Sequence, residues 1–328
     1  MTIQRKRYLD VDLELTAQIK GQADFITLSE DGRWIAIIYS GEQHLFDAYT
    51  GQEYGKGHDP GVISTDGKLM ANMRDGAIQI FNIDGKQVIK PYPHPGGDSP
   101  GVDLCFTADS QRLWVTLWNE DGTGKLALVD AETLEELDAV PMPVAAENDE
   151  TTWMLPFMTL HIPSDTLALQ HVYSDAWYLL GVFFFTIHEK QIKQHDFHIP
   201  PDSDLAMMSS TAFSASGQQF AGIVGSRYIW VWQMQGMNTH QLWNLLDDEK
   251  EKMFVALTFI GEQLIALVEN EGSYELCVVD VDHIRLSSRS PLPSNFVFPP
   301  YLPPTMRGRT LVGMQSEDVV IYRIGLKV

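Results

Sequence analysis

The sequence predicts an all-β protein, a seven-bladed β-propeller whose last blade is closed by the N-terminal strand. Three observations support this fold class. A short unit with a tight turn recurs seven times, the runs that flank each turn are apolar, and a strand-like segment at the N-terminus is left to complete the last unit. We expect a single propeller domain over residues 1–328.

The repeated unit reads apolar, small, apolar, Ser or Thr, any residue, Asp, and then Gly or Ser. Ile26–Gly32 and Leu104–Ser110 are clear copies, and each leads into a mostly apolar run. The seven turns are centred at positions 31, 66, 109, 165, 216, 262 and 307, and they lie 35 to 56 residues apart. This spacing brackets the roughly 40–45 residues of a propeller blade.

The chemistry of the unit is that of a β-hairpin. Asp-Gly between two apolar runs indicates a tight turn, because these residues tolerate positive φ. Runs that are apolar on both faces predict strands covered on both sides, as in stacked blades. A third strand follows in each unit, for example at Lys125–Val129 and Tyr274–Val279. The apolar run Tyr178–Ile187 is too short to span a bilayer and is interpreted as a buried strand.

The two ends of the chain predict how the propeller closes. The last unit has three strands and then ends, so it lacks a fourth. Near the N-terminus, apolar and acidic residues alternate, as is typical of a half-buried strand: Leu9, Asp10, Val11, Asp12, Leu13, Glu14 and Leu15. We expect this strand to join the last blade and cover its free edge. A six-bladed propeller, in which the last unit is not a blade, is the alternative.

Several units place an aromatic or aliphatic residue followed by Asp at the end of the third strand. Examples are Phe46-Asp47 with Thr50-Gly51, and Val129-Asp130 with Thr133. In these positions nearly the whole chain resembles the WD40-like and YVTN-like propeller repeats, although no unit has a Trp-Asp pair. By analogy at the level of the fold, this resemblance implies a non-enzymatic scaffold or protein–protein interaction module.

The net charge and the cysteine content indicate which classes of partner and which cellular compartment to expect. The chain carries 44 acidic residues against 23 Lys and Arg, a formal net charge of −21. A field of that sign repels phosphate, so we expect no nucleic acid and no anionic membrane as partner, but a protein or a basic peptide. Cys105 and Cys277 lie in different units, and the first twenty residues lack the apolar run of a secretory signal, which indicates a cytoplasmic protein.

A binding surface is expected on one rim of the propeller. We define the rim by the turns between second and third strands and by the connectors between blades: Arg74–Gly76, Trp118–Gly122, Val172–Trp177, Gly225–Arg227, Glu269–Gly272, Pro91–Pro100, Pro141–Trp153, Ile199–Ala206 and Leu246–Met253. With the short segments near Asp59 and Glu317, the rim holds 19 acidic residues and four Lys or Arg.

Aromatic anchors within a charged surround are typical of protein interfaces. We therefore predict a partner-binding surface from these rim residues: Trp118, Asp121, Asp149, Glu150, Trp153, Tyr173, Asp175, Trp177, Arg227 and Tyr228. In the alternative interpretation, the acidic loops only keep the protein soluble and the aromatic side chains pack beneath the connectors.

A second interpretation makes the chain a hydrolase. Some propellers that this chain resembles open lactones with rim His, Glu and Arg groups, and His58, His94 and Arg74 would then form the site. No cofactor or metal is expected, because no motif for either stands out in the sequence. His195 and His198 are not expected to form a metal pair, because residues three apart on a strand point to opposite faces. A cation-binding propeller is a further alternative. His161 is expected to be a hydrogen-bonded structural residue.

Overall fold

The structure is a computed structural model, and it describes the residues within these ranges: 10–39, 42–57, 61–74, 77–82, 92–93, 103–118, 124–142, 157–173, 178–195, 208–234, 239–246, 252–298 and 305–327. They form seven antiparallel sheets, and within the described ranges the only helical segment is a 3-10 turn, η1 (Ile162–Ser164). The fold is the predicted all-β, seven-bladed β-propeller. None of the described segments is a helix that is long and apolar enough to cross a membrane.

The chain divides into two compact units. Unit 1 comprises Met1–Ala23, Ala48–Gly51 and Ser209–Val328, and unit 2 comprises Asp24–Asp47 and Gln52–Met208. The expectation of a single domain over residues 1–328 stays a prediction.

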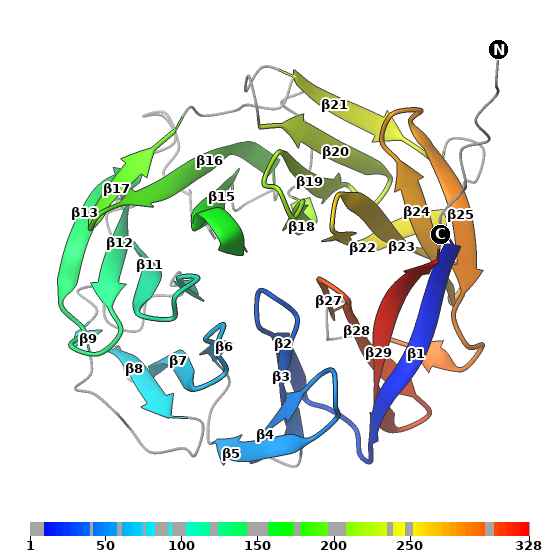
Figure 1. Cartoon of the computed structure of the whole chain (residues 1–328), viewed down its shortest axis with the longest axis horizontal. Coiled ribbons are helices and arrows are strands. Elements are labelled where there is room, and N and C mark those ends of the chain that lie inside the picture. The colour runs from blue at the N-terminus through cyan, green and yellow to red at the C-terminus, as the bar shows by residue number, and fades with distance from the viewer. Residues whose placement is uncertain are drawn as a thin grey trace. The chain divides into compact units, whose positions relative to one another are not determined.

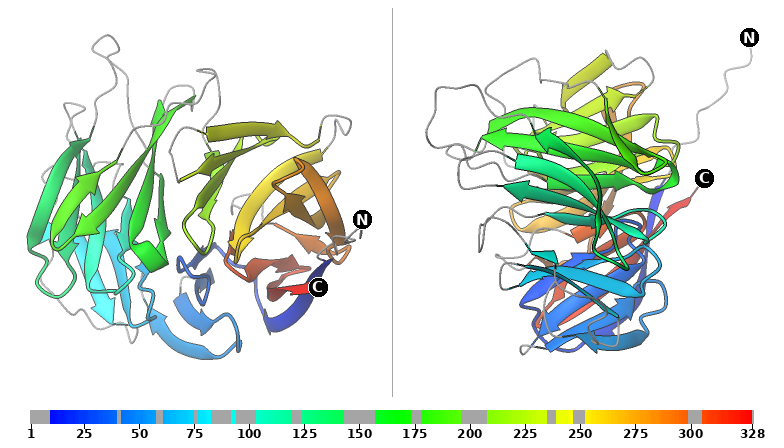
Figure 2. Two further views of the ribbon diagram at one scale, coloured as in Figure 1. Left: turned by 45° about the horizontal axis from the view of Figure 1, so that its top comes forward. Right: turned by 90° about the vertical axis from the view of Figure 1, so that its left-hand side faces the viewer.

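Unit 2 holds four sheets, and each has its four strands in chain order (Figure 1). The first two are β2 (Phe25–Leu28), β3 (Trp34–Tyr39), β4 (Glu42–Asp47), β5 (Glu53–Gly57), and β6 (Val62–Ile63), β7 (Leu69–Arg74), β8 (Ala77–Asn82), β9 (Tyr92–Pro93). The next two are β10 (Leu104–Phe106), β11 (Arg112–Trp118), β12 (Gly124–Asp130), β13 (Glu136–Met142), and β14 (Phe157–His161), β15 (Thr166–Tyr173), β16 (Tyr178–His188), β17 (Gln191–Gln194). The strands of these sheets twist relative to one another (Figure 2).

Unit 1 holds the other three sheets, of which two again follow chain order. These are β18 (Met208–Phe213), β19 (Gln219–Val224), β20 (Tyr228–Gln233), β21 (Thr239–Asn244), and β22 (Lys252–Ile260), β23 (Gln263–Asn270), β24 (Ser273–Asp280), β25 (Arg285–Pro291). The last sheet joins the two ends of the chain: β1 (Asp10–Ile19), β26 (Phe296–Val297), β27 (Thr305–Arg307), β28 (Thr310–Gln315) and β29 (Asp318–Lys327).

The core consists of sheets packed face against face, and β12 shows why its strand sequence is apolar throughout. Alternate residues of a strand point to opposite faces. Leu126 and Leu128 pack with Leu167 and Leu169 of the next sheet. Ala127 and Val129 belong to a separate cluster with residues of the preceding sheet. The side chains of these four consecutive residues of β12 are fully buried, as expected for a strand that is covered on both faces.

The repeated Ser/Thr-x-Asp unit forms a hydrogen-bonded turn between the first two strands of a sheet. In the third sheet the Thr107 hydroxyl donates to Asp109 (2.6 Å) and accepts the N–H of Arg112 (3.1 Å), while Asp109 accepts the N–H of Gln111 (3.0 Å). The turns that begin at Ser29 and Ser64 repeat these three bonds. These three turns therefore use a hydroxyl residue followed two positions later by Asp, and in the fifth sheet Ser216 takes the place of Asp after Ser214.

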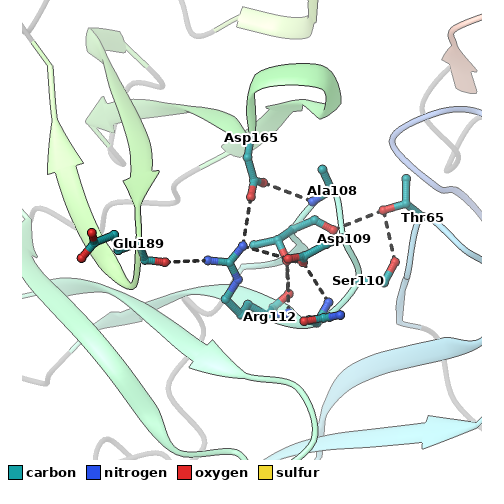
Figure 3. A network of polar contacts seen from close by, with 9 residues as sticks. Thr65, Ala108, Asp109, Ser110, Arg112, Asp165 and Glu189 are labelled. Carbon is teal, nitrogen blue, oxygen red and sulfur yellow. Dashed lines mark hydrogen bonds and ion pairs between the residues drawn. The ribbon is translucent and has the colours of Figure 1, made fainter.

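The fourth sheet departs from this pattern and uses its aspartate to join two sheets (Figure 3). Pro163 stands where the other turns have a hydroxyl, and Asp165 lies in the left-handed region at φ 51°. Its carboxylate accepts the N–H of Ala108 (3.1 Å) and lies 3.5 Å from Arg112, which also pairs with Asp109 at 2.9 Å. Burial raises the pKa of Asp165, and the contacts with Ala108 and Arg112 offset this only in part.

The N-terminal strand closes the last sheet, as predicted. β1 pairs antiparallel with β29 from Asp10 opposite Lys327 to Ile19 opposite Val319. A bulge at Thr16 interrupts the predicted alternation after Leu15, and Leu15 itself is 47% exposed. At the bulge, the Thr16 hydroxyl lies 2.9 Å from the carbonyl oxygen of Ala48, which places the turn after β4 against β1.

Gly51 lies where the turn after β4 approaches β1 closely, so a substitution there can test this packing. Gly51 has φ +69°, and a Cβ there would lie 2.6 Å from the Cβ of Ala17. Gly225 has φ +55° with nothing within 4 Å, so Gly225→Ala is a matched control for backbone strain alone. We expect Gly51→Ala to lower the free energy of unfolding by about 1–3 kcal/mol more than the control does, as measured by urea denaturation. Equal losses would contradict close packing.

Asp165 and Asp109 should respond to pH in opposite ways. Because the pKa of Asp165 is raised in the folded protein, its charged form costs stability at neutral pH, and this cost disappears as pH falls through the raised pKa. Partial burial raises the pKa of Asp109, but bonds from Thr107 and Gln111 and the charge of Arg112 outweigh it, so the net pKa is lowered. The stability that Asp109 contributes is therefore lost as pH falls through that lowered pKa.

Asp165→Asn keeps an oxygen acceptor for Ala108, whereas Asp165→Ala removes it. We expect the alanine variant to be less stable than the asparagine variant by about 1–2 kcal/mol near neutral pH, because only it leaves the N–H unpaired. On acidification, wild type should gain stability relative to Asp165→Asn and lose it relative to Asp109→Asn. Thermal unfolding measured across the acidic range checks this, and the same trend in both pairs would contradict it.

Candidate functional site

Four of the predicted residues lie at equivalent ends of hairpin strands. Arg74, Trp118 and Tyr173 end the second strands of their sheets, and Tyr228 begins a third strand. The structure therefore places these residues beside the turns between second and third strands, where the sequence placed the rim. The remaining predicted residues, except Arg227, lie outside the described ranges: His58, His94, Asp121, Asp149, Glu150, Trp153, Asp175 and Trp177.

Arg227 is anchored in its own unit. It follows Ser226, which has φ 59°, and its guanidinium donates to the carbonyl oxygen of Leu246 (3.0 Å). The carbonyl oxygen of Ser226 accepts the N–H of Phe254 (2.7 Å). These bonds tie the turn between β19 and β20 to the connector and the first strand of the next sheet, so Arg227 has a structural role in the rim of unit 1.

Two cations share one carboxylate beside this turn. Glu275 of β24 lies 3.0 Å from Lys252 and 3.2 Å from Arg289. The side chains of Lys252 and Glu275 are only 14% and 19% exposed. Lys252, one of the four rim cations, is therefore neutralised by Glu275, a strand residue outside the rim segments.

An aromatic cluster supports the same end of the sheet. The ring centroids of Tyr274 and Phe298 lie 5.0 Å apart at 85°, and those of Phe296 and Phe298 lie 5.1 Å apart at 87°. Both pairs have the edge-to-face geometry that aromatic rings prefer. Phe296 is buried against Gly313, where a Cβ would lie 2.2 Å from its ring, so a larger residue would displace the cluster.

Exposed apolar side chains lie next to this cluster. Met253 is the second residue of β22 and is 40% exposed. Val297 is 42% exposed, but it points to the opposite face of β26 from Phe296. Large side chains exposed beside a fixed aromatic group are typical of surfaces that bind another protein. We name the surface formed by Met253, Glu269, Tyr274 and Phe298 the unit 1 rim patch.

The sequence analysis included part of this patch without selecting it. Its rim segments contain Met253 and Glu269, but Tyr274 was assigned only to a strand, and Phe298 belongs to no repeat. The register between strands is the missing information, because it decides which side chains share a face. The aromatic residues of the segment Phe296–Phe298, just before the last repeat, were the available signal.

The histidines singled out in the sequence have structural contacts. His161 is buried, and its Nδ1 lies 2.6 Å from the Ser164 hydroxyl, so it is hydrogen bonded as predicted. His195 follows β17, and its Nε2 lies 2.8 Å from the Thr186 hydroxyl. The predicted outer strand is thus displaced toward the N-terminus, and His198 lies outside the described residues.

Metal ligands do not gather in the part of the chain that the structure describes: no three His, Cys, Asp or Glu side chains there could hold one ion. Cys105 and Cys277 are both buried as free thiols. The expectation that the protein uses neither metal nor cofactor stays a prediction.

The class that the structure defines is the β-propeller, with seven four- or five-stranded antiparallel sheets. No protein-family model matches the chain, and no curated protein matches its sequence. The fold class therefore rests on the structure and on the repeat.

Removing the shared carboxylate of Glu275 should destabilise the fold, because the two cations beside the patch then lack a counter-charge. We expect Glu275→Gln to lower the free energy of unfolding by about 1–2 kcal/mol, because Lys252 and Arg289 lose their common counter-charge in a partly buried position. Glu136→Gln is the matched control, since its pair with Lys125 is 35–37% exposed and should contribute about 0.5 kcal/mol or less. Denaturation by urea measures both, and equal effects would contradict the argument.

Proposed function

We propose that this chain is a WD40-like protein–protein interaction module, a non-enzymatic scaffold that binds a protein or a basic peptide through its rim. One observation carries the proposal: the unit 1 rim patch exposes Met253 beside Glu269 and an aromatic group that is fixed by edge-to-face packing. Hot spots of protein interfaces combine such anchors with rigid support.

Two further features support this function. The net charge of −21 favours basic partners and disfavours nucleic acid and anionic membranes. The aspartates that carry the resemblance to WD40-like repeats also stabilise turns, since Asp130 at the end of β12 accepts the N–H groups of Glu132 (3.0 Å) and Thr133 (2.8 Å). The free thiols of Cys105 and Cys277 are consistent with the proposed cytoplasmic location.

Capture of a partner from a lysate of the native cell tests the proposal. We expect tagged protein to retain a basic protein, identified by mass spectrometry, and we expect the charge reversal of Asp149, Glu150 and Asp175 to Lys to abolish that capture, because these rim acids supply the attraction. The control reverses three exposed acids at turns between third and fourth strands, Glu132, Glu135 and Glu189. Equal loss with both triple variants would indicate a general charge effect, and unchanged capture with the rim variant would refute the acidic rim.

A further inference from the structure

Three side chains of the unit 1 rim patch form a row across three strands. In the register of the sheet, Met253 of β22 lies opposite Glu269 of β23, and Glu269 lies opposite Tyr274 of β24. Residues directly opposite each other in antiparallel strands point to the same face, with Cβ atoms about 4.5–5.5 Å apart. Glu269 is therefore flanked by a thioether on one side and a phenol ring on the other.

Both neighbours of Glu269 present surface to solvent, but Tyr274 is held in place. Met253 is 40% exposed, while Tyr274 packs edge-to-face against Phe298 and Phe296. The Tyr274 hydroxyl also accepts the N–H of Phe298. The ring is thus fixed before any partner arrives, and this reduces the conformational entropy that binding must overcome.

The carboxylate of Glu269 differs from that of Glu275, which lies on the other face of the same sheet. Glu275 is held by two cations, whereas the carboxylate of Glu269 makes no hydrogen bond or ion pair with the residues that the structure describes. Glu269 is nevertheless only partly exposed. Partly buried carboxylates are stabilised by a paired cation, so this position favours the approach of a positive group.

The electrostatic surroundings of Tyr274 agree with this geometry. Burial raises the pKa of the Tyr274 hydroxyl, and the negative charge of Glu269 raises it further. Of the basic side chains of the same sheet, Lys252 and Arg289 contact Glu275 on the opposite face, and Arg285 pairs with Asp280 at the far end of β24. The row therefore presents a negative charge between two apolar groups.

We propose that the row Met253–Glu269–Tyr274 binds an arginine side chain of a partner protein. A guanidinium group is planar, forms two parallel hydrogen bonds with a carboxylate and stacks on aromatic rings, whereas its methylene stem covers apolar surface such as the Met253 side chain. The inference rests on the proposed function and names the side chain that the rim recognises.

The Met253 methyl group provides a local probe in the full-length chain. We would label the 13 methionines with ¹³C-methyl groups, assign the Met253 resonance with Met253→Leu, and titrate Nα-acetylarginine methylamide at constant ionic strength. A saturable shift of the Met253 resonance is expected. Glu269→Gln should weaken the apparent affinity about tenfold, because a hydrogen bond to a charged partner is lost.

Matched variants and ligands decide the outcome. Glu271→Gln removes the same charge from the exposed turn two residues away and should leave the affinity within about twofold, because exposed charges contribute little. The citrulline analogue, which is neutral but has the same shape, should give no saturable shift. The absence of a shift with the arginine probe, or equal shifts with citrulline, would overturn the proposal. Equal affinity for the lysine analogue would overturn the choice of arginine.

The two proposals can fail separately. If capture from the lysate depends on the rim acids but the Met253 resonance does not respond to arginine, the rim binds its partner by another chemistry. If the resonance responds and rim reversal leaves capture unchanged, the row binds arginine but the acidic rim is refuted as the source of the attraction. If the row binds free arginine methylamide but Glu269→Gln does not reduce capture of the partner, a small-molecule site is indicated and the protein partner is overturned.

Discussion

Central strands that are apolar on both faces, such as β12, are stable only when neighbouring sheets cover them on both sides. In β12, the residues that alternate along a single strand enter two different clusters, one with Leu167 and one with Leu113. The hairpin turns, the register of the strands and the polar contacts between sheets all help to hold these apolar faces against each other. The buried apolar area supplies the main driving force, about 25 cal/mol per Å² removed from water.

Side chains that accept backbone N–H groups fix the register from one sheet to the next. In unit 2, Asp103 accepts the N–H of Met158 (3.0 Å), and Asp138 accepts that of Ile192 (2.7 Å). In unit 1, the Ser210 hydroxyl accepts the N–H of Leu257 (3.1 Å). Apolar packing is not directional, so these bonds add the specificity that packing alone lacks.

The sequence was sufficient to predict the blades, because turn chemistry and apolar periodicity are local properties. It predicted the turn at Asp109, the strand from Tyr178 to Ile187 and the pairing of the N-terminal strand with β29. It did not predict that Asp165 joins two sheets, that β1 has a bulge after Leu15, or that Glu269 lies between Met253 and Tyr274. These features depend on register and on contacts between distant segments, which a single sequence does not encode locally.

The pairing of β1 with β29 has a consequence for biosynthesis. About 300 residues separate the two strands, so the entropy of closing this loop opposes their pairing, although that entropy grows only slowly with length. A nascent chain emerges N-terminus first, and β1 therefore has no partner until β29 has left the ribosome. During that interval an edge rich in Asp and Glu protects the waiting strand from pairing with other chains. The alternating acidic residues of β1 thus oppose aggregation of the nascent chain before β1 pairs with β29 and completes the last sheet.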